Sequence, residues 1–143
     1  MKTLLKTLAL TLLLSSMTAQ AESRVAIIVN ADNGQNLTLQ DISNIYNDKI
    51  VTWDNHQKID VYNLPTASRT REVFSRALLG LSAMTAAANE SNRQITNTSR
   101  NPQHLKRERL VILSVANNKN AIGYVKASSI GQNKKIKVLF FIK

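Results

Sequence analysis

The apolar positions of the chain fall into short runs typical of strands and longer stripes typical of helices. Residues 24–29 form a near-continuous run of strand formers, which favours a strand buried on both faces. Residues 58–62 alternate polar and apolar and predict a half-buried strand. Residues 121–125 and 136–142 predict two further strands close to the end of the chain.

Between these runs, the apolar positions recur at helical spacing in four segments, at residues 39–47, 70–79, 82–92 and 105–116. Thr38 suits the N-cap of the first helix, with Asp41 three residues later, and Gly80 suits the end of the second. The polar residues 93–104 are expected to form a loop. The order β-α-β-α-α-α-β-β predicts an α/β domain with a mostly parallel sheet flanked by helices.

The first 21 residues have the three-part pattern of a secretory signal peptide. A basic start is followed by an apolar run at residues 8–14, and Ala19 and Ala21 suit the −3 and −1 positions of a cleavage site. The run is shorter than the roughly 20 apolar residues that span a bilayer. We therefore expect a signal peptide at 1–21 and one periplasmic domain at 22–143, with no transmembrane segment after cleavage.

The net charge narrows the range of partners. The chain carries +10, and removing Lys2 and Lys6 with the signal peptide leaves +8. Export argues against nucleic acid as the partner, and the sparse aromatic residues argue against a single-strand binder. The remaining anionic partners are phosphate or sulfate, acidic polysaccharide, lipid head groups or an acidic protein face.

The sequence gives no sign of a cofactor, a metal or a catalytic motif. There is no cysteine, and the two histidines, His56 and His104, lack the spacing of zinc ligands. A Gly-x-Ser-x-Gly elbow, a Walker loop and a dinucleotide loop are all missing from the sequence. We therefore expect a binding protein and not an enzyme.

Three stretches of the chain resemble one known family. In the first, residues 39–54, an expected helix ends in Ile-Tyr and is followed by a turn with Lys-Ile and then a Trp. The second consists of Ile-Asp-Val at residues 59–61 and Ser-Arg-Thr-Arg-Glu-Val-Phe at residues 68–74. The third, residues 121–125, reads Ala-Ile-Gly-Tyr-Val. In order and spacing they are similar to the periplasmic phosphate-binding proteins of ABC transporters, a branch of the type 2 periplasmic binding proteins. The resemblance covers about residues 24–140.

This resemblance implies a single lobe and a role in capturing phosphate or a phosphate-like anion for ABC transport or sensing. Members of the family have two lobes and close on the anion from both sides, whereas this chain resembles one lobe. Their Ser-Gly-Thr loop corresponds to Ser68, Arg69 and Thr70, and their phosphate-pairing arginine falls on Leu64. We expect weak affinity unless a homodimer or another partner supplies the second wall.

The candidate anion site consists of Ser68, Arg69, Thr70 and Arg71, at the start of the helix predicted from residue 70. Helix N-termini attract anions through unpaired N–H groups and the helix dipole. Two arginines at such a position are unfavourable against the dipole, and a bound oxyanion would offset this. The alternative is that a hydroxyl simply caps the helix and that the arginines are solvated or paired.

A second basic cluster supports a different function. Its members lie in or beside the predicted loop of residues 93–104, namely Arg93, Arg100, His104, Lys106, Arg107 and Arg109. They are either a solvated face or a docking face for an acidic protein or lipid head groups of the envelope. In the second case the domain would be an interaction module that has lost small-ligand binding. Trp53 is expected to fill the core, with a ligand platform as the alternative.

Overall fold

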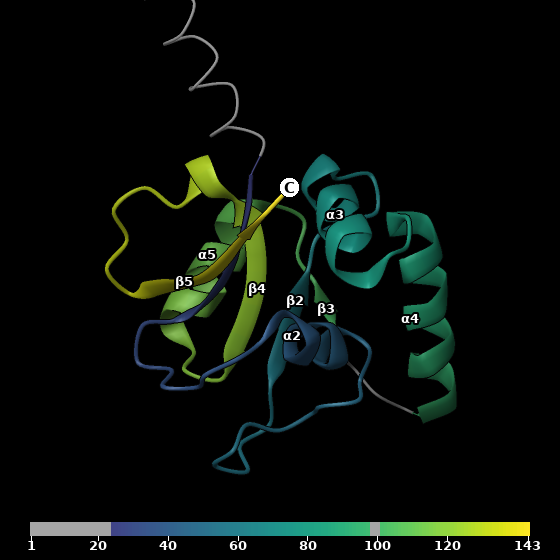
Figure 1. The fold of residues 1–143 in the computed structure, drawn as a ribbon, viewed down its shortest axis with the longest axis horizontal. Helices are drawn as coiled ribbons and strands as arrows, with labels where there is room; N and C mark the ends of the chain where they lie inside the picture. The colour runs from purple at the N-terminus through teal and green to yellow at the C-terminus, as the bar shows by residue number, and fades with distance from the viewer. Residues whose placement is uncertain (1–23, 98–100) are drawn as a thin grey trace, which may run out of the picture.

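The fold is a single five-stranded sheet with helices on both faces. The computed structural model describes residues 24–97 and 101–143, so the predicted signal peptide lies outside the described residues. The strands lie in the order β3-β2-β4-β1-β5 across the sheet. Their bounds are Val25–Asn30 for β1, Asp60–Asn63 for β2, Gln103–His104 for β3, Ala121–Lys126 for β4 and Ile136–Ile142 for β5. Figure 1 shows the sheet between the helical layers.

Four of the five strands point the same way. β2 pairs in parallel with β3 and with β4, whereas β1 pairs antiparallel with β4 on one side and with β5 on the other. β1 alone therefore runs against the others, and the α/β fold with a mostly parallel sheet is confirmed. All six residues of β1 are buried, as expected for a strand with neighbours on both edges and layers on both faces.

Two neighbouring residues of β4 show which helices cover each face. Successive strand residues point to opposite faces. A Cβ at Gly123 would lie 2.5 Å from Val111 of α5 (Glu108–Asn117), so this face is covered by α5. Tyr124 contacts Phe74 of α3 (Arg69–Phe74) and Tyr46 of α2 (Leu39–Tyr46), so these two helices cover the other face.

The predicted caps and stops are in place. Thr38 and Asp41 form a capping box at the start of α2, and Gly80 ends the helical segment that begins with α3, at φ 67°. The last turns of that segment, Ser75–Leu79, are π-helical, which the spacing of apolar residues does not predict. No helix in the described part of the chain is both long enough and apolar enough to cross a membrane.

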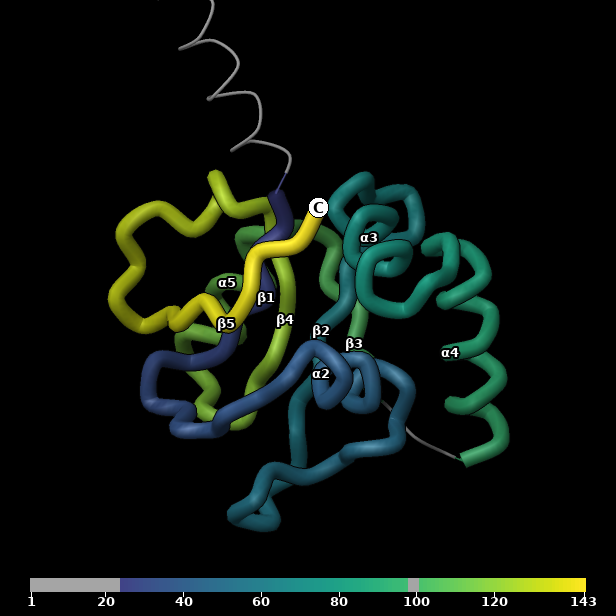
Figure 2. The backbone as a smooth tube through the Cα atoms, in the orientation of Figure 1, coloured from purple at the N-terminus to yellow at the C-terminus, as the bar shows by residue number. Residues whose placement is uncertain are grey.

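The prediction of a loop over residues 93–104 is wrong at both ends. α4 (Ala83–Asn97) continues five residues beyond the predicted end of its helix, and Gln103 and His104 form the edge strand β3 beside β2. Figure 2 shows α4 along the outer side of the molecule. Contacts of its last turns with other parts of the chain explain the extension. Arg93 donates to Asp48 and to Tyr46 O, which are distant in sequence, and Gln94 donates to Asn101 O.

Candidate functional site

The candidate anion site lies where the chain leaves β2 and enters α3. Ser68 N–H donates to Pro65 O at 2.9 Å, which closes the turn before the helix. Ser68 Oγ accepts from Arg71 N–H at 3.3 Å, and Glu72 N–H makes the first intrahelical bond, to Ser68 O at 3.1 Å. Helical geometry therefore leaves the N–H groups of Arg69 and Thr70 without an intrahelical acceptor.

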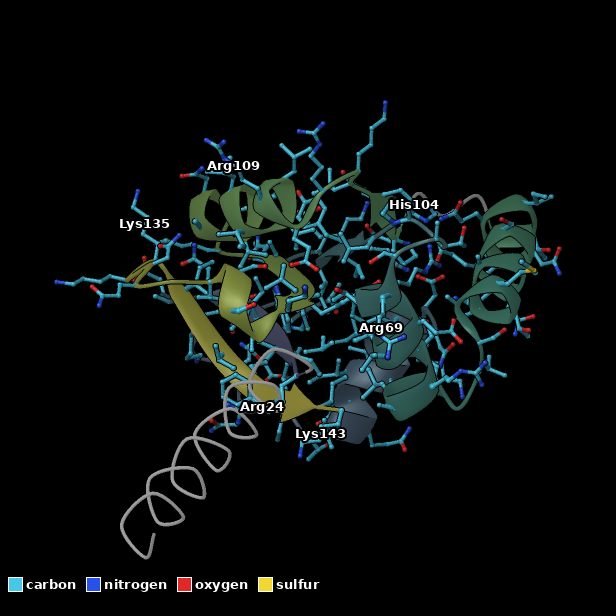
Figure 3. The ribbon with its side chains drawn as sticks, turned by 90° about the horizontal axis from the view of Figure 1, so that it is seen from above. Arg24, Arg69, His104, Arg109, Lys135 and Lys143 are labelled. Carbon is cyan, nitrogen blue, oxygen red and sulfur yellow. The ribbon has the colours of Figure 1, made fainter. Side chains whose placement is uncertain are left out.

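The four predicted site residues do not share one face. Ser68 is half-buried and Arg69 is exposed, and Figure 3 shows the Arg69 side chain on the surface of α3. Thr70 is 7% exposed and Arg71 only 1%, because both side chains turn toward the core. The structure thus leaves the Arg69 side chain exposed and Ser68 partly exposed, and it encloses the Arg71 guanidinium.

Arg71 is held in a buried network of polar groups. Its Nη1 donates to Leu64 O at 2.8 Å and its Nη2 donates to Glu90 Oε2 at 3.1 Å. The same carboxylate accepts from Asn63 Nδ2 at 3.0 Å and contacts His104 Nε2. Because an unpaired charge is very costly inside a protein, these contacts explain how an arginine can remain in the core. They join β2, β3, α3 and α4.

The hydroxyl of Thr70 is occupied by a residue that sequence analysis did not connect to this site. Thr70 Oγ1 donates to Glu108 Oε1 at 2.5 Å. The other oxygen of Glu108 accepts from Lys126 N–H at 3.1 Å and from Ser129 Oγ at 2.6 Å. This places a carboxylate beside the α3 N-terminus, where it opposes the charge of Arg69. No local pattern signals the contact, since Thr70 and Glu108 lie 38 positions apart.

The second basic cluster is divided by the fold. Arg93 pairs with Asp48 at 3.1 Å, and His104 contacts Glu90, while Arg100 lies outside the described residues. Three members remain exposed at the start of α5 with no ion pair to any described residue, namely Lys106, Arg107 and Arg109.

The aromatic groups beneath α3 are structural. Phe74 stacks on Tyr124 with ring centroids 3.8 Å apart, and the Tyr46 hydroxyl donates to Tyr62 O at 2.8 Å. Burial raises the pKa of Tyr46 well above its usual value, and burial raises the pKa of Tyr124 as well, so both phenols are neutral.

Trp53 is 4% exposed and joins the core, as expected. Among the described residues, no group of three or more histidine and carboxylate side chains is placed to hold a metal ion.

Comparison with known proteins identifies the fold. A family model described as a PBP superfamily domain matches residues 21–140. Among curated proteins, none matches the chain in sequence. A protein from Clostridium perfringens, assigned as a phosphate ABC transporter substrate-binding protein and solved with phosphate bound, shares 25% identity and a TM-score of 0.62 over 80% of this chain.

Two further solved structures have the same fold. An ABC-type phosphate transport receptor from Vibrio cholerae gives 23% identity and a TM-score of 0.61, and PstS from Borrelia burgdorferi gives 18% and 0.61. Each alignment covers 80% of this chain. The chain spans only 43% of the Clostridium protein, 44% of the Vibrio protein and 46% of the Borrelia protein.

Proposed function

Because the chain belongs to the family of PBP superfamily domains, we propose that it is a periplasmic binding protein for phosphate or a phosphate-like oxyanion. It serves ABC transport or sensing and catalyses no reaction. The observation that carries the proposal is the fold match to the Clostridium perfringens protein, which holds phosphate. The pattern of a cleaved signal peptide in residues 1–21 supports the periplasmic location.

The proposed contacts use the exposed part of the α3 N-terminus. The oxyanion accepts hydrogen bonds from the N–H groups of Arg69 and Thr70 and from the Ser68 hydroxyl, and the Arg69 guanidinium pairs with it from the solvent side. Arg71 acts indirectly, because its bonds to Leu64 O and Glu90 fix the start of the helix. Thr70 contributes its backbone, since its hydroxyl is bonded to Glu108.

This arrangement predicts weak binding by an isolated chain. The Glu108 carboxylate next to Thr70 reduces the positive potential at the site, and solvent screens the exposed Arg69. The anion also meets protein on one side only. We propose that a second copy of the chain or a transporter subunit supplies the opposite wall, so that phosphate increases the dimer fraction measured by light scattering. A tight, strictly monomeric phosphate binder contradicts this part of the proposal.

Isothermal titration with phosphate and sulfate tests the site, using two arginine variants with the same charge change. Arg69→Ala removes the proposed ligand, whereas Arg76→Ala removes another exposed arginine, which pairs with Glu72 further along the same helical segment. We expect phosphate binding to be lost in Arg69→Ala and retained in Arg76→Ala. Absence of heat with the unmodified protein, or equal loss in both variants, contradicts the proposal.

A second function is favoured by one specific observation: three exposed cations at the start of α5 form no ion pair within the described part of the chain, namely Lys106, Arg107 and Arg109. They could form a docking face for an acidic envelope protein in a module that binds no small ligand. This function is supported if binding of an envelope protein weakens with salt, is lost when these three residues are neutralised and is retained in Arg69→Ala.

A further inference from the structure

Two adjoining cavities lie at the end of the sheet opposite the α3 N-terminus. The first, of about 300 Å³, is formed by the loops that follow β1 and precede β2 and β4. The second, of about 370 Å³, lies beside it between the end of β1, the end of α5 and the loop before β5. Both are lined by Asp32 and Lys119, so the two cavities are neighbours. Figure 1 shows these loops at the lower end of the sheet, with α3 at the upper end.

The first cavity is lined mainly by carboxamide side chains around a buried tryptophan. The carboxamides come from all three loops: Asn33, Gln35, Asn55, Gln57 and Asn120. The side-chain amides of Gln57 and Asn120 make no hydrogen bond to any described residue. Each can both donate and accept, which suits a ligand with several hydroxyl groups.

The loops around this cavity are fixed by bonds between them. Asn33 Nδ2 donates to Lys119 O at 3.3 Å, and Trp53 Nε1 donates to Asn120 O at 3.1 Å. Beside them, Asn30 Nδ2 donates to Val115 O at 2.9 Å and ties the end of β1 to α5. The free amides are therefore presented by a preformed surface, which lowers the entropy cost of binding.

The second cavity carries an excess of positive charge. Lys119, Lys134 and Lys135 line it, and none of them forms an ion pair with a described residue. Asp32 is its only carboxylate. A ligand that lies across both cavities thus meets carboxamides in the first and the residues Lys134 and Lys135 in the second, with Lys119 between them. Figure 3 shows Lys135, which lines this cavity, far from Arg69 of the proposed phosphate site.

We propose that the two cavities form a binding site for an acidic saccharide, with sugar hydroxyls on the amides and carboxylate or sulfate groups on the lysines. The size supports a sugar over a bare ion, because volumes of about 300 and 370 Å³ reach the lower end of the range of small-molecule sites. The site goes beyond phosphate binding and does not depend on it.

The test is titration of the full chain with trigalacturonic acid, with its methyl ester and inorganic phosphate as comparison ligands. We expect the acid to bind and the uncharged ester to bind about tenfold more weakly, because esterification removes the charges that the lysines contact. Phosphate bound at α3 is not expected to compete with the saccharide. Absence of binding by the acid, or equal binding of acid and ester, overturns the proposal.

Two triple variants with the same loss of charge locate the site. The lysine set is replaced in Lys119→Gln/Lys134→Gln/Lys135→Gln, and the matched control replaces the exposed cations of α5 in Lys106→Gln/Arg107→Gln/Arg109→Gln. We expect about tenfold weaker trigalacturonate binding in the first and little change in the second. Gln57→Ala is expected to weaken the binding of the acid and of the ester by the same factor. Arg69→Ala is expected to leave the affinity for both ligands unchanged. Equal losses in the two triple variants overturn the proposal, since they indicate non-specific attraction to a basic protein.

Discussion

Removing Glu90 tests the role of the buried polar network most severely. In Glu90→Ala, Arg71, which is 1% exposed in the intact protein, loses its one carboxylate partner among the described residues and keeps the bond to Leu64 O. Its Nε already lacks a hydrogen-bond partner among the described residues. Asn63 Nδ2 and His104 lose an acceptor in the same substitution.

The expected loss of stability follows from the burial of both charges. Glu90 is 4% exposed, so its carboxylate and the Arg71 guanidinium are both largely removed from solvent in the folded protein. Removing one partner of such a pair costs about 3–5 kcal/mol of unfolding free energy, out of a total of about 5–15 kcal/mol for a typical domain. Urea unfolding monitored by circular dichroism measures the difference, provided that the m-value stays unchanged.

Two variants serve as controls. Arg76→Ala breaks an exposed pair with Glu72 and is expected to change stability little. Arg71→Met/Glu90→Met removes both charges together and is expected to be more stable than Glu90→Ala, because no buried charge is left unpaired. A loss below about 1 kcal/mol in Glu90→Ala, or a double variant less stable than the single one, refutes the reasoning.

Three further predictions test the packing and the titration of the core. Gly123→Ala places a methyl group 2.5 Å from Val111 Cγ1 and is expected to cost about 1–3 kcal/mol, with a lower melting temperature; an unchanged melting temperature contradicts this close approach. Burial raises the pKa of Tyr46 and Tyr124, so the folded state holds their protons at a pH where the unfolded state releases them. Stability should therefore be unaffected by these groups below about pH 10 and decrease above it, which urea unfolding at pH 9 to 11 measures. In ultraviolet titration, the absorbance change of these two tyrosines should coincide with alkaline unfolding. Ionisation of either tyrosine while the protein is still folded would contradict their burial.

Much of the fold could be predicted from the sequence because the apolar pattern is local. The continuous apolar run that forms β1, the capping box at Thr38 and the stop at Gly80 each depend on residues that are close in the chain. The extension of α4 and the short strand β3 could not be predicted in this way. They depend on pairing with residues such as Asp48 and Asn63, which are distant in sequence.

The candidate site was predicted only in part for the same reason. Ser68 and Arg69 lie where the pattern of a helix N-terminus places them, with Ser68 as the N-cap. The sequence does not indicate that Arg71 points into the core, because its partners Leu64 and Glu90 belong to β2's exit and to α4. Nor does it place Glu108 beside Thr70. The burial of Arg71 and the Glu108 carboxylate beside Thr70 both lower the positive charge that an anion meets at the α3 N-terminus.

The most direct test of the binding proposal is a phosphate titration of residues 22–143, followed by ¹⁵N–¹H NMR. Phosphate binding at the α3 N-terminus predicts saturable shifts of the Arg69 and Thr70 amide signals. In Arg69→Ala the signals of residues 69 and 70 should no longer shift with phosphate, whereas in Arg76→Ala they should shift as in the unmodified protein. Absence of saturation, or shifts confined to other parts of the chain, contradicts it.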